Sequence, residues 1–307
     1  MRSMYVLRTV TGILGAAAML WSQAAPTTAI RAGKLFDPKS GQMLANQVVL
    51  IQGERIMGVG PAASVPIPAG AKLIDLSRAT VLPGLIDGHL HLTDAAGGLQ
   101  HQMIVALHSA TESLKAGYTT QVVQGTHGGG FADVELKRAI EQGLVQGPRL
   151  LPAGPILAIT APGAGPYPLE VKPSEVEIVK DGPDALRAGV RELAHYGADH
   201  VKIHTTGAFY FKPNGEMVNQ ALPSLEELKA VVDEAHRRGM FVASHTYGGD
   251  GLKWAIEAGV DDIQHATAAT VWNSAHPAED VDYLIAVFRG AGRDTKSVGH
   301  LSTGIRN

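Results

Sequence analysis

Hydrophobic and polar positions follow two different patterns along the chain. In the first part, short β-rich segments are separated by turn residues such as Asp37-Pro38 and Ser40-Gly41, a pattern typical of a small antiparallel unit. We expect its strands at residues 29–35, 47–52, 55–59 and 72–75. From Val81 onward the pattern changes to an apolar strand, a loop, an amphipathic helix, a glycine and the next strand.

The clearest predicted helix runs from Ser224 to Arg238. Ser224 and Glu227 have the spacing of a capping box, and Gly239 is suited to end the helix. The same order predicts further helices at residues 133–143, 184–197 and 251–259. From Val81 we count six strands and five helices, which favours βαβ units and a parallel sheet.

Composition narrows the classes of protein. The 307 residues are 45% hydrophobic and 18% charged, which excludes a disordered tail protein. Lys and Arg total 26 against 29 Asp and Glu, so nucleic acid is not an expected partner. There is no cysteine, which excludes disulfides, thiolate metal sites and a cysteine nucleophile. Chemistry must therefore depend on other residues, among them 13 histidines.

The N-terminal segment has the features of a secretory signal peptide. Arg2 and Arg8 precede a mostly apolar run from Val10 to Trp21, and small residues follow it. We expect residues 1–24 to be a signal peptide that is cut after about Ala24. A membrane anchor is the alternative, but the run is shorter than the roughly 20 residues that span a bilayer. The prediction is an exported protein, periplasmic or secreted, without stable membrane insertion after cleavage.

Two histidines lie at the end of the strand that opens at Val81. Side chains two residues apart on a strand face the same way, so His89 and His91 can both reach one ion at about 2.0–2.1 Å. A pair of structural histidines, each with a hydrogen-bond partner, is an equal alternative at this point.

Three further residues favour the metal interpretation. His245 and His265 end two later predicted strands, and Lys202 lies between apolar neighbours in another. In a parallel α/β barrel the site lies at the carboxyl ends of the strands, and all five residues fall at or near such ends. The alternative for Lys202 is a buried ion pair with a carboxylate.

These motifs resemble the amidohydrolase superfamily of metal-dependent hydrolases, nearest to its imidazolonepropionase-like and dipeptidase-like members. The matching segments are residues 82–91, 197–203, His245, 257–265 and, ahead of them, 32–37. The resemblance covers about residues 30–267. It implies an incomplete (β/α)8 TIM-type barrel over residues 81–270, with about six βα units, preceded by a β-sandwich portion over residues 25–80.

The resemblance also implies a two-metal centre. His89 and His91 would bind one ion, His245 and His265 the other, and Lys202, carboxylated by CO2, would bridge them. Zinc is the favoured metal, with manganese, iron or cobalt as alternatives. A metal-activated water would hydrolyse a C–N bond in a peptide, an N-acyl amino acid or a cyclic amide, and export favours the peptide.

The sequence departs from the family after the sixth predicted strand. The family has an aspartate at the end of the eighth barrel strand, whereas no apolar strand precedes Asp294 here. Residues 271–307 lack periodicity beyond a short helix at 283–288. We interpret this segment as a frameshifted or prematurely ended version of a longer parent, or as a short variant that closes by dimerisation. A non-catalytic, metal-binding remnant therefore stays open as an alternative, as does a homo-oligomer.

Weaker signals concern loops. The run His127-Gly-Gly-Gly resembles the oxyanion loop of lipases and raises a serine-esterase alternative, but the Gly-x-Ser-x-Gly elbow of that class is missing. His127, His204 and Tyr210 are candidate substrate contacts, with ordinary packing as the alternative for each. The loop around Tyr167 is a candidate cover for the pocket.

Overall fold

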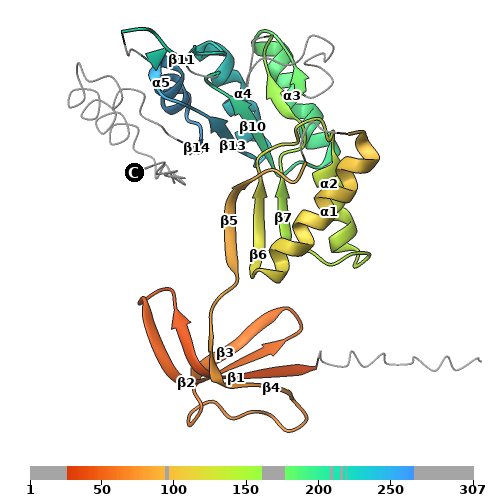
Figure 1. Ribbon diagram of the computed structural model, residues 1–307, viewed down its shortest axis with the longest axis vertical. Helices are drawn as coiled ribbons and strands as arrows, with labels where there is room; N and C mark the ends of the chain where they lie inside the picture. Colours follow the sequence, from red (N-terminus) through yellow and green to blue (C-terminus); the bar gives the residue numbers. More distant parts are fainter. Residues whose placement is uncertain are drawn as a thin grey trace, which may run out of the picture. The chain divides into compact units, whose positions relative to one another are not determined.

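The computed structural model describes residues 26–93, 97–160, 177–207, 210–214, 217–218 and 220–265. It divides into an N-terminal unit that ends at Pro83 and a C-terminal unit that begins at Gly84 (Figure 1). The predicted signal peptide, Tyr167, Asp294 and the segment 271–307 lie outside the described residues.

The N-terminal unit is a four-stranded sheet with the order β3-β2-β1-β4. Its strands are β1 (Thr27–Asp37), β2 (Gln42–Gln52), β3 (Arg55–Pro61) and β4 (Lys72–Val81). β1 pairs with β2, and β2 with β3, in antiparallel fashion, but β1 and β4 are parallel. The expectation of a purely antiparallel unit is therefore wrong. Residues 62–71 carry the chain from one edge of the sheet to the other, so that β4 runs in the same direction as β1.

The boundary between the units also differs from the prediction. Val81 ends β4, and the next strand, β5 (Leu85–Leu90), starts four residues later. Pro83 lacks the N–H group that a strand needs for pairing. Gly84 lies so close to Thr119 that a Cβ at this position would come within 2.0 Å of the Thr119 hydroxyl oxygen. Pro83 interrupts the strand pairing. Gly84, which has no Cβ, allows the chain to pass close to Thr119 of β6, where β5 starts.

Helices and strands alternate through the C-terminal unit, as predicted. The helices are α1 (Leu99–Lys115), α2 (Ala132–Glu141), α3 (Pro183–Tyr196), α4 (Leu225–Arg237) and α5 (Gly249–Ala258). The remaining strands are β6 (Tyr118–Val123), β7 (Arg149–Pro152), β8 (Ile156–Ala158), β9 (Glu177–Val179), β10 (His200–His204), β11 (Tyr210–Phe211), β12 (Met217–Val218), β13 (Phe241–His245) and β14 (Asp262–Gln264). The predicted capping box is present, because Ser224 and Glu227 each accept a hydrogen bond from the other residue's backbone N–H.

The strands of this unit form two parallel sheets, β5-β6-β7 and β14-β13-β10-β8-β9, and β11 pairs with β12 in a separate antiparallel hairpin. A parallel bridge between Thr126 and Pro155 links the end of β6 to the start of β8. The predicted α/β class is confirmed. From β5 through β6, β8, β10 and β13 to β14 the strands follow chain order, as in part of a (β/α)8 barrel.

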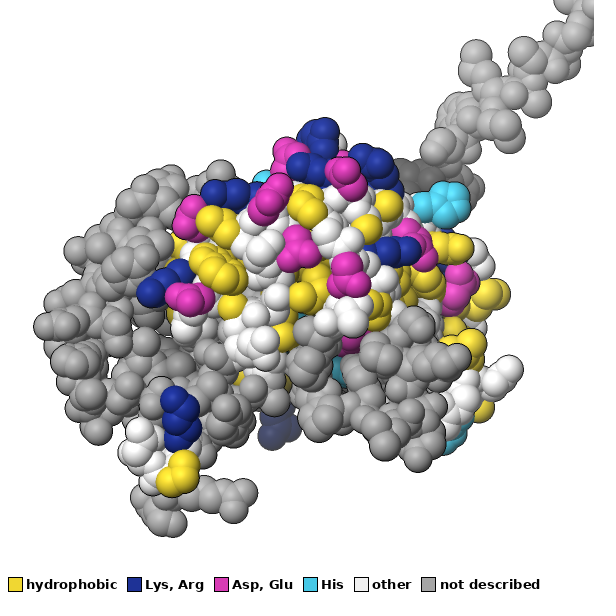
Figure 2. Space-filling view, turned by 90° about the horizontal axis from the view of Figure 1, so that it is seen from above, with side chains coloured by type: hydrophobic (Ala, Val, Ile, Leu, Met, Phe, Trp, Pro, Cys, Tyr) yellow, Lys and Arg dark blue, Asp and Glu magenta, His cyan; other side chains and the backbone are white. Residues whose placement is uncertain are grey.

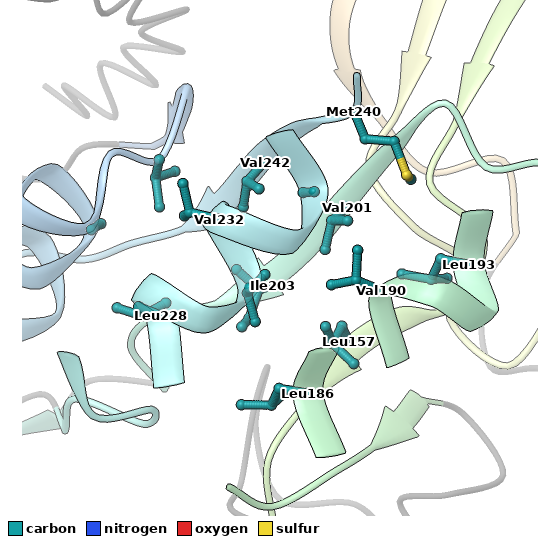
Figure 3. Packing of buried hydrophobic residues seen from close by; sticks show 14 of the residues in the cluster. Leu157, Leu186, Val190, Leu193, Val201, Ile203, Leu228, Val232, Met240 and Val242 are labelled. Atoms are coloured by element: carbon teal, nitrogen blue, oxygen red, sulfur yellow. The ribbon is translucent and has the colours of Figure 1, made fainter. Parts of the chain in front are cut away.

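The apolar core lies between the sheet and helices α3, α4 and α5 (Figure 3). Val201 and Ile203 of β10 belong to it, together with Val242 of β13 and Ile263 of β14. Since side chains alternate along a strand, the residues between them face the other side of the sheet. We call that other side the inner face. Its residues on these three strands are His200, Lys202, His204, Phe241, Ala243, His245, Asp262 and Gln264.

The outer surface of the helices is polar. Arg187 pairs with Asp233 at 2.6 Å, and Arg191 pairs with Glu234 at 2.9 Å, so ion pairs join α3 to α4. Figure 2 shows acidic and basic side chains interleaved on the surface of the C-terminal unit where α3, α4 and α5 lie. Among the helices of the described ranges, none combines the length and the apolar character needed to cross a bilayer.

Candidate metal centre

Four histidine rings, those of His89, His91, His245 and His265, lie close together. His89 is in β5, and His91 is the first residue after this strand. The centroids of the two rings are 5.4 Å apart. The ring of His265 lies 4.7 Å from that of His89 and 4.9 Å from that of His245. Two imidazoles bound to one tetrahedral ion have centroids about 5 Å apart, since the metal–nitrogen bond is about 2.0–2.1 Å. The spacing of the rings is thus that of ligands that share an ion.

His91 has a fixed orientation. Its Nδ1 atom lies 2.9 Å from the backbone carbonyl oxygen of Gly125. A carbonyl oxygen only accepts, so Nδ1–H is the donor and the lone pair is on Nε2. This arrangement leaves Nε2 of His91 available as a ligand.

Lys202 is buried in the middle of β10, with 1% of its surface exposed. Its position is two residues before the end of β10, which is His204. Within the described ranges its Nζ atom has no hydrogen-bond partner. The register places Ala243 between Lys202 and Asp262, which leaves room between the amine and the carboxylate. Burial lowers the pKa of Lys202 to about 7, against the attraction of Asp262.

His89, His91 and His245 are neutral near pH 7. Burial, with the charge of Lys202 as the next cause, lowers the pKa of His89 to about 3 and that of His245 to about 3. Burial and the neighbouring His127 lower the pKa of His91 to about 4. A neutral imidazole has the free lone pair that a metal ligand requires.

His265 has an unusual backbone conformation. Its φ angle is +64°, in the left-handed region that non-glycine residues rarely occupy. The residue directly follows β14, and the turn ends the strand where the ring meets those of His89 and His245. Strained backbone of this kind often marks a functional position.

Two of the three candidate substrate contacts, His127 and Tyr210, have different outcomes. The His127 ring lies 4.3 Å from that of His91, so the loop after β6 reaches the cluster. The Thr126 hydroxyl donates to the Gly130 carbonyl at 2.6 Å and closes this glycine-rich loop. The backbone of Tyr210 is in β11, but its side chain lies outside the described part of the structure.

Sequence reasoning missed one aromatic residue, Tyr247, and one buried carboxylate, Glu177. The Tyr247 ring lies 4.3 Å from that of His245 and 5.5 Å from that of His265. Its position two residues after a candidate ligand at a strand end was an available signal. His204 lies 5.0 Å from His245, with its Nδ1 atom 3.7 Å from a carboxylate oxygen of buried Glu177. Nothing in the spacing of the sequence indicates that Glu177 reaches this cluster.

The residues fit a divalent cation by their chemistry rather than by a finished geometry. Among the described residues, no group of three or more His, Cys, Asp or Glu side chains is arranged as a formed metal site. In the described part of the structure, the buried atoms without a hydrogen-bond partner include Nζ of Lys202, Nε2 of His245 and Oδ1 of Asp262. Such atoms are costly to bury, and a bound cation would satisfy them.

Comparison with known proteins agrees with the fold. The model of the amidohydrolase family matches residues 80–287, which is more than half of the chain. The chain belongs to the amidohydrolase family. The predicted resemblance is thereby confirmed.

Individual amidohydrolases extend the comparison. Ochratoxinase of Aspergillus niger is 29% identical over 284 residues, and the match covers 81% of this chain and 56% of that protein. The structure is similar to that of an Xaa-Pro dipeptidase with methionine bound in its active site, with 32% identity and a TM-score of 0.69, over 85% of this chain and 65% of the other. The A. niger ochratoxinase structure gives a TM-score of 0.70 at 25% identity, over 88% and 64%. The chain thus spans about half the length of the curated relative.

Proposed function

We propose that this amidohydrolase is a metal-dependent hydrolase of C–N bonds in dipeptides or N-acyl amino acids. The observation that carries the proposal is the set of neutral imidazoles around a buried amine without a hydrogen-bond partner. The ligands of two divalent ions, for which zinc is the first candidate, would be His89, His91, Lys202, His245 and His265.

Lys202 has a specific part in this proposal. The neutral amine would add to CO2, forming an N–C bond and releasing one proton, to give a carbamate. The buried amine would then become an anionic group with two oxygen ligands, beside the unpaired Nε2 of His245. When bound, the divalent ions supply a water of lowered pKa and polarise the carbonyl under attack.

The choice of substrate class has two supports. One relative of known structure is named as an Xaa-Pro dipeptidase, so its fold accommodates a dipeptide. The exported location that we predict from residues 1–24 would bring the enzyme into contact with peptides. His127, next to His91, and Tyr247, next to His245 and His265, would contact the substrate beside the cluster.

The test combines metal content with activity. The chain, taken from a gel-filtration peak of defined size, should contain about two ions by elemental mass spectrometry and hydrolyse members of a dipeptide and N-acyl amino acid panel. Lys202→Ala and His89→Ala should lose metal and activity, whereas His195→Ala, an exposed histidine on α3, should keep both. A monodisperse sample without metal would overturn the proposal. Two ions without turnover would instead indicate a non-catalytic metal-binding protein.

A further inference from the structure

The last described strand presents two polar side chains to the inner face. In β14, Asp262 and Gln264 alternate with Ile263, which belongs to the apolar core. Gln264 has no exposed surface, and Asp262 is 8% exposed. A buried amide without hydrogen bonds is costly, so the partners of Gln264 are informative.

Gln264 connects a carboxylate to a candidate ligand. Its Nε2 atom donates to Oδ2 of Asp262, and its Oε1 atom contacts Nδ1 of His89. An ionised carboxylate only accepts hydrogen bonds, so the amide NH2 group must face Asp262. The amide oxygen then faces His89 and can only accept, which requires the proton of the neutral imidazole to be on Nδ1.

We propose that Gln264 is a positioning residue that holds His89 in the tautomer with its lone pair on Nε2, while Asp262 holds the amide of Gln264 in the required orientation. This inference rests on the proposed function, because it assigns the Nε2 lone pair of His89 to a metal ion. It also explains why polar residues occupy both inner-face positions of β14.

His89 depends on a side chain where His91 does not. A backbone carbonyl orients His91, and no substitution at Gly125 removes that acceptor. The acceptor for His89 is an amide 175 residues away in sequence, on a different sheet. Outer partners of this kind typically contribute 10–100-fold to metal affinity.

A matched set of variants tests the metal affinity. Gln264→Met keeps the size of the side chain and removes the acceptor, whereas Gln264→Glu keeps an acceptor for His89. The control is Gln121→Met, which changes a glutamine of the same burial on β6. We expect Gln264→Met to weaken Zn2+ binding about 10–100-fold in competition with a chromophoric chelator. Gln264→Glu should bind more tightly than Gln264→Met, and Gln121→Met should bind as the natural chain does.

The tautomer can be read without metal or turnover. In 15N-histidine-labelled, metal-free protein, two-bond 1H–15N correlation spectra distinguish Nδ1–H from Nε2–H imidazoles, and His89→Asn assigns the His89 signals. We expect Nδ1–H for His89 in the natural chain and a mixture of tautomers in Gln264→Met. If that variant does not fold, the spectrum of the natural chain still decides.

The outcomes separate this inference from the proposed function. An Nε2–H tautomer for His89, or equal Zn2+ affinity in Gln264→Met and Gln121→Met, overturns the role of Gln264 even if the enzyme is active. An Nδ1–H tautomer that becomes mixed in Gln264→Met supports the role of Gln264, even if the metal-loaded protein hydrolyses nothing on the substrate panel. In that case the proposed function alone would fail.

Discussion

The two faces of the parallel sheet differ in chemistry, although their residues alternate along the same strands. The outer face is apolar, and the inner face carries polar candidate ligands. On β10, Val201 and Ile203 face the helices and lie in a closed apolar core. Lys202, between them, faces inward and has no hydrogen-bond partner. Burial of the outer face therefore stabilises the folded state. Burial of unpaired candidate ligand atoms on the inner face destabilises it. Residues that stabilise the fold and candidate ligands are thus adjacent in the sequence of one strand.

The outer face should show the largest effect on stability. Ile203 is 1% exposed within the core, so Ile203→Ala should lower the free energy of unfolding by about 2–5 kcal/mol. Urea denaturation of the metal-free protein measures this change. Metal bound per folded molecule should stay the same, because the side chain points away from the inner face. If Ile203→Ala lost metal under conditions in which the protein is fully folded, the two faces would not be separable.

Replacing Lys202 on the inner face should have the opposite sign. Lys202→Met should raise the unfolding free energy of the metal-free protein near pH 7 by about 1–3 kcal/mol, because an unpaired buried amine is removed. The same variant lacks the side chain that we propose as the ligand bridging the two ions, so it should lose activity. A less stable Lys202→Met protein would argue against the cost that we assign to the inner face.

The pH dependence sharpens this prediction. Burial lowers the pKa of Lys202 from 10.5 to about 7 in the folded state. Between about pH 7 and about pH 10 the unfolded chain therefore binds more protons than the folded one, so the unfolding free energy of the natural chain rises with pH across this window. Denaturation curves in CO2-free buffer with a chelator should show the rise, and Lys202→Met should flatten it.

The smallest effect is expected far from both faces. The hydroxyl of Ser224 accepts the N–H of Glu227 at the start of α4. Ser224→Ala should lower the unfolding free energy by about 1 kcal/mol without changing metal content. Ser224→Asp, which restores a cap, should recover most of the loss. If both variants unfold at the same urea concentration as the natural chain, the cap contributes nothing measurable.

Local pattern was enough to predict much of the fold but only part of the site. Periodicity and the capping box of Ser224 and Glu227 locate α4 because their signals lie within one turn of helix. The parallel pairing of β4 with β1 could not be predicted, because alternation is the same in both strand directions. Strand ends indicated the candidate ligands. The contact of Gln264 with His89 joins two different sheets across 175 residues of sequence, and no local signal contains it.

The positive φ angle of His265 allows the demands of folding and of chemistry to be measured at one position. Glycine and asparagine tolerate that conformation better than other residues. In a library of all twenty amino acids at position 265, sorting for folded protein should enrich glycine and asparagine, whereas sorting for retained metal should return histidine. The divergence between the two sorted populations would give a direct measure of how far this site departs from the sequence that the backbone alone would select.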